Sequence, residues 1–309
     1  MAMDLRQLRY FVALATQQHY GKAAEVLHVT QPALSRQIRL LEEELGVQLF
    51  ERHARGAAPT DEARLLLERA LFLLRYVEQT KSDLLARQKE PRGPVAIGMS
   101  PGIAQQLTVM LTREVLQQFP EVRLRFIEGF APSMQTLLAQ GEVDIALLIE
   151  PIERSNLTIV PLLKEQICLI GMPGDPRIQK ARIKIRDLAG VPLVMTGLVK
   201  SGVRLELEAA AARAKVALNH VVEVETAEVA RRLVLDGIGL TAHFAAAVNE
   251  DIEAGRLRAV PIEGLFLHRI LARAADRPVS RATEGVMGVL RMVVERHVRE
   301  GKWPNAQLS

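Results

Sequence analysis

The chain has 309 residues, enough for two or three domains, and its 49% hydrophobic and 25% charged residues exclude a largely disordered or low-complexity protein. The net charge is only +4, which excludes a diffuse positive surface as the basis for binding nucleic acid. A single cysteine, Cys168, excludes an internal disulfide, and the absence of a leader pattern and of about 18 consecutive apolar residues predicts a cytoplasmic protein without a membrane partner.

Three short helices are expected at the start of the chain. Helical spacing of apolar residues and good capping residues predict helices over residues 4–17, 20–27 and 30–46. Residues 47–50 have the pattern of a short strand, and a turn follows it. Three helices and a small hairpin predict a winged helix-turn-helix domain over residues 1–60.

A long helix follows this domain over residues 61–88. It carries more apolar residues than a single solvated helix should expose. We expect a linker helix whose apolar side is a dimer seam, and packing of that side on its own domain is the alternative. The expected dimerisation residues are Leu67, Leu71 and Leu74. Two prolines and a glycine then predict a hinge at residues 89–93.

From residue 94 onward the pattern changes to strands that alternate with helices. Continuous apolar strands between helices predict an α/β architecture with parallel strands. The expected strands span residues 95–99, 122–127, 143–149, 167–172, 193–196 and 221–225. The expected helices span residues 103–119, 134–140, 203–217 and 227–235.

The outer face of the third expected helix carries side chains that can read DNA. Gln and Arg form bidentate hydrogen bonds with base edges, and a position near a helix N-terminus suits the major groove. One such residue alone would indicate an ordinary solvated face, whereas the whole pattern predicts a recognition helix. The expected DNA-binding residues are Thr30, Gln31, Pro32, Ser35, Arg36 and Arg39, together with Arg52 and Arg55 in the wing.

Four segments carry a resemblance to a known family: residues 5–12 (LRQLRYFV), 31–35 (QPALS), 41–46 and 49–52 (LFER). They resemble the LysR-type transcriptional regulators, densely over residues 4–67 and more loosely over the rest of the chain.

Two details refine this resemblance. Residues 55–60 and 201–205 resemble the subgroup of nitrogen assimilation control proteins. Among the departures, His19 stands where the family usually has a Ser or Thr cap, and Phe244 stands where it commonly has a Pro.

The resemblance implies a sequence-specific DNA-binding transcriptional regulator. Its effector-binding domain, residues 94–309, would have two α/β lobes like those of periplasmic binding proteins, with the chain crossing between them twice. Lobe one would comprise residues 94–163 and 268–302, and lobe two residues 164–267. The implied partners are a double-stranded DNA operator, a small-molecule effector, and further copies of the chain in a homodimer or homotetramer, with RNA polymerase as an additional candidate. No cofactor or metal is implied.

Hydroxyl side chains mark the expected strand-to-helix junctions of this domain. Hydroxyls and free N–H groups at helix N-termini favour anions, and open α/β sheets bind ligands at the carboxyl ends of their strands. Each junction taken singly is equally well explained as a helix cap. The expected effector-binding residues, for a small organic anion, are Ser100, Thr196, Ser201 and Thr226. Arg204 is expected to be a surface residue, and pairing with a carboxylate is the alternative.

Two other classes of function fit the sequence poorly. An enzyme is not expected, because the chain has no nucleotide-binding Gly-rich loop, no Cys/His metal spacing and no Gly-x-Ser-x-Gly motif. A solute-binding protein would require export and would leave the first 60 residues without a role.

Overall fold

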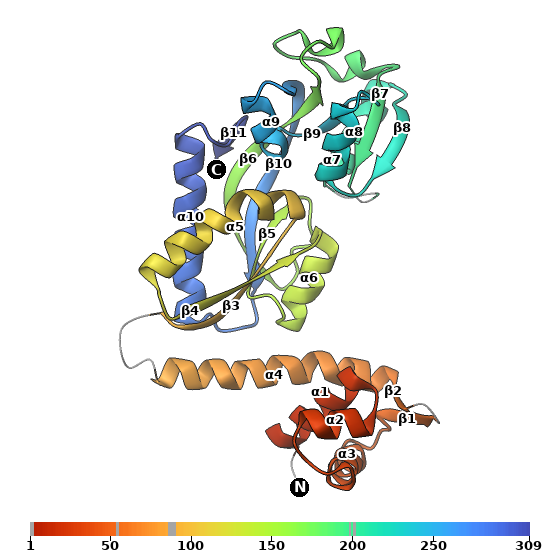
Figure 1. Cartoon of the computed structure of the whole chain (residues 1–309), viewed down its shortest axis with the longest axis vertical. Helices are drawn as coiled ribbons and strands as arrows, with labels where there is room; N and C mark the ends of the chain where they lie inside the picture. Colours follow the sequence, from red (N-terminus) through yellow and green to blue (C-terminus); the bar gives the residue numbers. More distant parts are fainter. Residues whose placement is uncertain (1–2, 54–55, 86–90, 198, 200–201) are drawn as a thin grey trace. The chain divides into compact units, whose positions relative to one another are not determined.

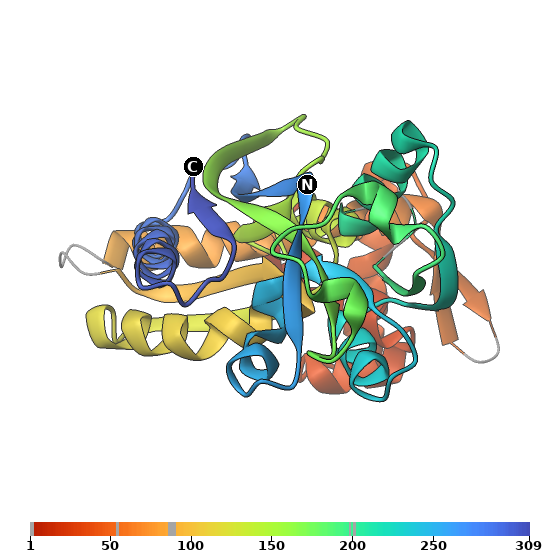
Figure 2. The ribbon, with the colours of Figure 1, turned by 90° about the horizontal axis from the view of Figure 1, so that it is seen from above.

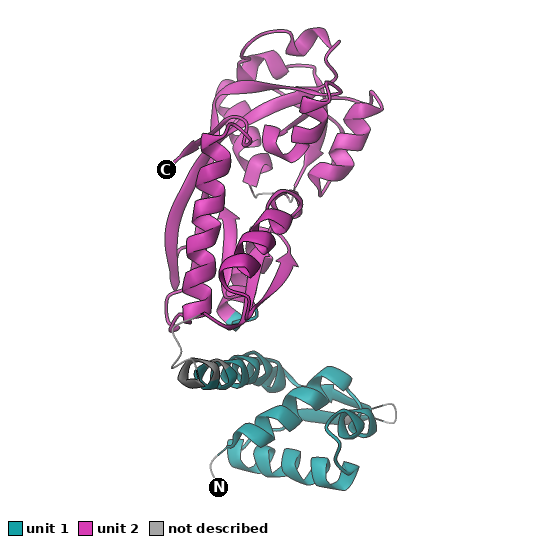
Figure 3. Cartoon of the chain, turned by 60° about the vertical axis from the view of Figure 1, so that its left-hand side comes forward, with its two compact units in different colours: residues 1–89, 140–142 teal, residues 90–139, 143–309 magenta. Residues whose placement is uncertain are grey.

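The computed structural model describes residues 3–53, 56–85, 91–197, 199 and 202–309, but not the side chains of residues 52, 79 and 82–85. The chain divides into two compact units (Figure 3), residues 1–89 with 140–142 and residues 90–139 with 143–309. Among the expected functional positions, Arg55, Ser201, the Arg52 side chain and part of the 89–93 hinge lie outside the described residues.

The first unit is a winged helix-turn-helix followed by a long helix (Figure 1). Its elements are α1 (Leu5–Gln17), α2 (Tyr20–Val26), α3 (Gln31–Leu45), β1 (Phe50–His53), β2 (Gly56–Pro59) and α4 (Asp61–Leu85). The three expected helices are confirmed. The strand expected at residues 47–50 was placed too early, because Val47 and Gln48 are exposed and β1 begins only at Phe50, where the antiparallel pairing with β2 starts.

Local hydrogen bonds explain why the first two helices begin where they do. Asp4 and Gln7 form a reciprocal capping box at the start of α1. His19 caps α2 in place of the usual hydroxyl, since its Nδ1 accepts a hydrogen bond from the Gly21 amide at 3.1 Å. The departure at His19 therefore keeps the function of the cap with a different side chain.

The wing lies against the junction of α1 and α2, and a glycine makes this approach possible. Gly56 has a φ of 149°, and a Cβ atom at this position would lie 2.3 Å from the Gln18 carbonyl oxygen. The neighbouring Ala57 amide donates a hydrogen bond to the same carbonyl at 2.8 Å. A side chain at position 56 would thus push the wing away from the helices.

The core of this unit includes one side of α4. Phe11, Leu14, Leu34, Ile38 and Leu41 are fully buried between the three short helices. Along α4, the buried positions are Ala63 and Ala70, and Leu67 and Leu74 pack partly buried against the same core. Part of the apolar surface of α4 therefore serves its own domain, which was the alternative to a dimer seam.

The second unit is an α/β domain, and its two largest hydrophobic cores are described below (Figure 1). Its elements in the first part of the chain are β3 (Gly93–Met99), α5 (Pro101–Gln118), β4 (Val122–Glu128), α6 (Ala131–Gln140), β5 (Ile145–Ile149) and β6 (Leu157–Gly171). After two short 3-10 turns they are β7 (Pro192–Thr196), α7 (Gly202–Ala214), β8 (Asn219–Val224), α8 (Ala227–Leu235) and β9 (Thr241–Phe244). The last are α9 (Asn249–Glu253), β10 (Arg258–Ala274), α10 (Arg281–Arg299) and β11 (Ala306–Leu308).

The α/β architecture is confirmed, and the sheets contain antiparallel as well as the expected parallel strands. In lobe one β3 pairs in parallel with β4 and β5, and in lobe two β7 pairs in parallel with β8. The long strands β6 and β10 pair antiparallel with each other along most of their length, and β9 and β11 pair antiparallel with β6. The large sheet has the order β11-β6-β10-β5-β3-β4.

Strands β6 and β10 belong to both lobes. One core packs α5 and α10 on β3 and β5, with Leu163 and Leu271 contributed by β6 and β10. The other core packs α7 on β7 and β9, with Ile167 and Leu267 contributed by the same two strands. Figure 2 shows the two strands passing through the middle of the unit. The implied double crossing of the chain between the lobes is therefore made by β6 and β10.

In the described part of the chain, no helix is both long enough and apolar enough to cross a membrane.

Candidate nucleic-acid interface and effector cleft

The residues expected to read DNA lie on one exposed face of α3. Leu34, Ile38 and Leu41 are buried and fix this helix against the core. The outer face, starting at the N-cap, exposes Thr30, Gln31, Pro32, Arg36 and Arg39, with Ser35 half-buried beside them. Thr30 stands at the N-cap position without a side-chain capping hydrogen bond, which leaves its hydroxyl for another acceptor or donor.

The C-terminal turn of α3 is tied to the start of the wing by one carboxylate. Oε1 of Glu42 accepts hydrogen bonds from the backbone amides of Leu49 at 2.8 Å and Phe50 at 3.1 Å. Both of these residues are buried. Because a hydrogen bond to a charged acceptor is stronger than one between neutral groups, Glu42 sets the position of the wing relative to the recognition helix.

A cleft between the two lobes collects the N-termini of several helices. The start of α5 comes from lobe one, and the starts of α7 and α8 come from lobe two. The cleft encloses about 90 Å³ that the centre of a water-sized molecule can reach. Because each helix N-terminus carries roughly half a positive charge, this arrangement favours an anion.

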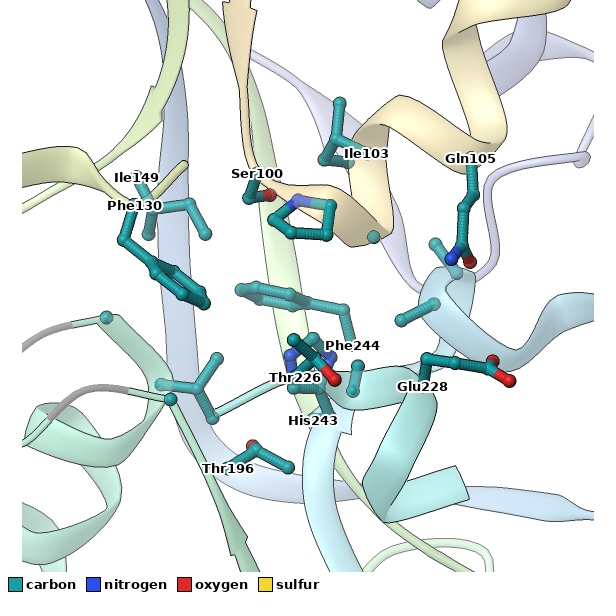
Figure 4. A pocket seen from close by; sticks show the side chains of 18 of the residues that line it. Ser100, Ile103, Gln105, Phe130, Ile149, Thr196, Thr226, Glu228, His243 and Phe244 are labelled. Carbon is teal, nitrogen blue, oxygen red and sulfur yellow. The ribbon is translucent and has the colours of Figure 1, made fainter. Parts of the chain in front are cut away.

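The structure brings together three of the four expected effector-binding residues in this cleft. Ser100, Thr196 and Thr226 all line it, and Figure 4 shows Ser100 at one end and Thr226 and Thr196 toward the other. Thr226 caps α8 by accepting from the Val229 amide, whereas Ser100 makes no capping hydrogen bond in α5. Thr196 is 4% exposed, and its hydroxyl has no hydrogen-bond partner among the described residues. Helix capping therefore explains Thr226 but not Ser100 or Thr196.

Comparison with known proteins identifies the chain. Residues 5–64 match the model of the bacterial regulatory helix-turn-helix protein, lysR family, and residues 88–295 match the model of the LysR substrate binding domain. The chain belongs to the LysR family of transcriptional regulators. It is 28% identical to the nitrogen assimilation regulatory protein Nac of Klebsiella aerogenes, over 97% of this chain and 98% of that protein.

This regulator is also similar to a hydrogen peroxide-inducible genes activator and to a solved structure of OxyR. It is 35% identical to the hydrogen peroxide-inducible genes activator of Pectobacterium carotovorum over 62% of this chain and 64% of that protein. A solved structure of a full-length OxyR variant from Pseudomonas aeruginosa superimposes with a TM-score of 0.75 at 26% identity, covering 96% of this chain and 95% of that one. As a member of this family, the regulator is a DNA-binding protein with an effector-binding domain.

The only cysteine of the regulator is not placed to react with peroxide. Cys168 lies on β6 with no exposed surface, and burial and the nearby Glu165 carboxylate raise the pKa of its thiol to about 12. Because the thiolate is the reactive form, this residue is inert in the folded protein, as its apolar sequence context indicates.

Several cleft residues carried no signal in the sequence. Phe130, Phe244, Ile149 and His243 line the cleft with their side chains, and Arg269 reaches it from β10. The ring of Phe244, which replaces a proline common in the family, is almost fully buried and faces this space (Figure 4). A hydrophobic residue after a strand looks like core in a sequence, so only the fold identifies these side chains as lining.

His243 is held neutral beside the cleft. Burial lowers its pKa to about 4, and the cationic Arg269 contributes to this lowering, so the imidazole carries no charge at neutral pH. Its Nδ1 is buried and has no hydrogen-bond partner among the described residues. The imidazole is therefore an uncharged ring whose Nδ1 is covered by the surrounding protein atoms.

The expectation for Arg204 was wrong. This side chain is only 8% exposed and does not line the cleft. Its guanidinium donates to Glu208 at 2.8 Å and to both carboxylate oxygens of Glu223 at 2.8 and 3.1 Å. Arg204 fastens α7 to β8.

Within the described residues, no group of three or more His, Cys, Asp or Glu side chains is arranged to hold a metal ion.

Proposed function

We propose that this regulator reads its operator with the exposed face of α3 and that a small organic anion in the interlobe cleft changes the DNA complex. The observation that supports the DNA-reading role is the single face that presents Gln31, Ser35 and Arg36 at the start of a helix whose other face is buried. Arg39 is partly engaged, since its Nε lies 3.6 Å from the Glu43 carboxylate. Arg52 and Arg55 stay predicted wing contacts.

The proposed reading of the operator by α3 is tested with Arg36→Ala. Loss of a bidentate base contact costs about 1–3 kcal/mol, so the variant should lose operator preference while its binding to unrelated DNA weakens less. Arg64→Ala on α4 is the matched control, because it removes the same charge from an exposed helix outside α3. Operator affinity equal to that of the unsubstituted regulator in a shift assay would contradict the assignment.

The effector-binding role is supported by the unpartnered hydroxyl of Thr196 in a cleft where three helices begin. A ligand acts as a switch only if it binds one arrangement of the lobes better than another. We propose the lobe boundaries at 94–163 with 268–302 and at 164–267, so that β6 and β10 carry the movement. Ser201, which lies outside the described residues, stays a predicted contact.

The cleft is tested with Thr196→Val, which keeps the volume of the side chain and removes its hydroxyl. Thermal shift of the full chain against a panel of organic anions finds a ligand, and calorimetry then measures its affinity. The variant should bind that ligand more weakly, whereas Thr136→Val, on the exposed side of α6, should bind it normally. Equal affinity in Thr196→Val and in Ser100→Ala would place the site elsewhere.

We also propose that the regulator is a dimer through α4, and that dimers pair into tetramers. One helix-turn-helix reads a half-site, and two must lie about 34 Å apart along the DNA. Since Leu67 and Leu74 partly serve their own domain, the apolar groups best placed for a partner are Leu65, which is 61% exposed, and Tyr76, which is 40% exposed and stacks on Phe72. RNA polymerase stays a predicted partner.

A further inference from the structure

Among the described residues that line the cleft, Arg269 carries the only positive charge, because His243 is neutral at neutral pH. It is 4% exposed, and its Nε donates to Oε2 of Glu165, which has no exposed surface. A guanidinium has five N–H donors. The other four have no acceptor among the described residues. A buried cation with unused donors at the wall of a cavity is poised to bind an acceptor brought by a ligand.

The surroundings of Arg269 are apolar and aromatic. Its Cζ lies 4.6 Å from the centre of the Phe244 ring, a cation–π contact that holds the guanidinium plane near the cleft. Phe130 and Ile149 from lobe one and Val203 from lobe two complete this wall. A flat apolar group would be buried between these side chains while an attached acceptor reaches Arg269.

Two carboxylates also line the cleft. Glu225 is exposed there, and Glu228 lies beside it at the first turn of α8. Hydrogen bonds from Arg231 lower the pKa of Glu228 to about 2, so this carboxylate stays charged. Because Arg269 is the only cationic side chain among the described lining residues, a second negative group on a ligand would find no further cation there, and repulsion from these two carboxylates opposes its binding.

We propose that Arg269 selects the effector by its charge, and that the effector is a small monocarboxylate with a planar, apolar body. This inference rests on the proposed binding of an organic anion in the cleft and names its class. The ligand carboxylate accepts hydrogen bonds from the free Nη donors of Arg269, while Nε keeps its bond to Glu165. Such charge-assisted, bidentate bonds are the strongest that a guanidinium makes with an anion.

The single tryptophan of the chain reports on this site. Nε1 of Trp303 donates to the second oxygen of Glu165 at 3.0 Å, and its indole is 3% exposed. A carboxylate that binds Arg269 adds a negative charge one side chain away from this hydrogen bond. Its binding should therefore change the emission of Trp303 with the same midpoint as the heat of binding.

Benzoate is the probe, titrated into the full-length regulator by calorimetry and by Trp303 emission. Benzamide has the same shape without the charge, and phthalate adds a second carboxylate. We expect benzoate to bind at least tenfold more tightly than either compound. Equal affinity for benzoate and benzamide would overturn the role of charge, and equal or tighter binding of phthalate would overturn the restriction to one carboxylate.

The role of Arg269 is tested in the double variant Glu165→Gln/Arg269→Gln, because Arg269→Gln alone would leave Glu165 buried and unpaired. A cooperative thermal transition establishes that the double variant is folded, and Arg269→Lys, which keeps the charge but lacks the fork, is a second variant. Both should bind benzoate at least tenfold more weakly. Lys164→Gln is the control, since this cation lies one residue from Glu165 but stacks on Phe266 outside the cleft and should leave the affinity unchanged.

The outcomes separate this inference from the proposed function. If an organic anion binds and is lost in Thr196→Val but binds normally to both Arg269 variants, the cleft site stands and the inference is wrong. If benzoate fails to bind the unsubstituted regulator while another anion of the panel binds in the cleft, the inference alone is wrong. If no anion of the panel binds, the proposed anion site and the inference fail together.

Discussion

Glu42 is expected to be the strongest single contribution of a charged side chain to the stability of the DNA-binding unit. Its carboxylate accepts from two buried amides, Leu49 and Phe50, at 2.8 and 3.1 Å. An amide left without an acceptor costs about 1–3 kcal/mol, so the loss of both bonds in Glu42→Ala should lower the free energy of unfolding by about 2–6 kcal/mol. With a urea dependence of about 1–3 kcal/mol per molar, the unfolding midpoint should fall by roughly 1 M or more.

The two units can be followed separately by their fluorescence. Tyr10, Tyr20 and Tyr76 are the only tyrosines and all lie in the first unit, whereas Trp303 lies in the second. Tyrosine emission should therefore show the loss in Glu42→Ala, and tryptophan emission should not.

Glu43→Ala is the matched control, because Glu43 is exposed and its ion pair with Arg39 is worth less than about 1 kcal/mol. Glu42→Gln, whose amide oxygen still accepts, should lie between the two. A Glu42→Ala variant that unfolds at the same urea concentration as Glu43→Ala would refute the role of this carboxylate.

Two further predictions concern assembly and the thiol. Leu65→Glu with Tyr76→Glu should give monomers in light scattering without loss of helical signal, because both side chains are exposed. Leu71→Glu with Leu74→Glu should give monomers and in addition destabilise the DNA-binding unit, since Leu74 packs on the core of that unit. An unaltered dimer in the first variant would place the interface elsewhere. Cys168, with its pKa raised to about 12, should resist a disulfide reagent at pH 8 in the folded regulator and react at once in urea. Rapid native labelling would contradict its burial.

Below neutral pH, protonation of His243 should lower the free energy of unfolding. Its pKa is lowered from 6.5 to about 4 in the folded protein, so the unfolded chain binds the proton first. The stabilisation is complete above pH 6.5 and is lost as the pH falls toward 4, by no more than about 3 kcal/mol. His243→Gln should flatten this limb when the Trp303 transition is measured across the same pH range, and an unchanged slope would assign the loss to other groups.

The sequence alone determined the DNA-binding unit almost completely. Its helices are short, their caps lie next to the residues they cap, and their buried faces recur at helical spacing, so each signal is local. Even His19, which departs from the usual cap, lies within two residues of the amide it binds. Strands β3 and β5 were equally clear because strands buried on both faces read as continuous apolar runs.

The tertiary structure alone decided how the cleft is built. The sequence predicted strand only over residues 167–172 of β6 and nothing of β10, because polar residues such as Lys164, Glu165 and Arg269 interrupt their apolar pattern. Glu165 and Arg269 are 104 residues apart, and each looks like a surface charge until the antiparallel pairing of β6 and β10 brings the two together as a buried pair. A buried charge is tolerated only beside its partner, and that partner is chosen by the fold, not by the neighbouring sequence. Hydroxyls at helix starts could be predicted because capping is local, whereas the cation and the aromatic wall of the cleft depend on strands that meet only in the folded domain.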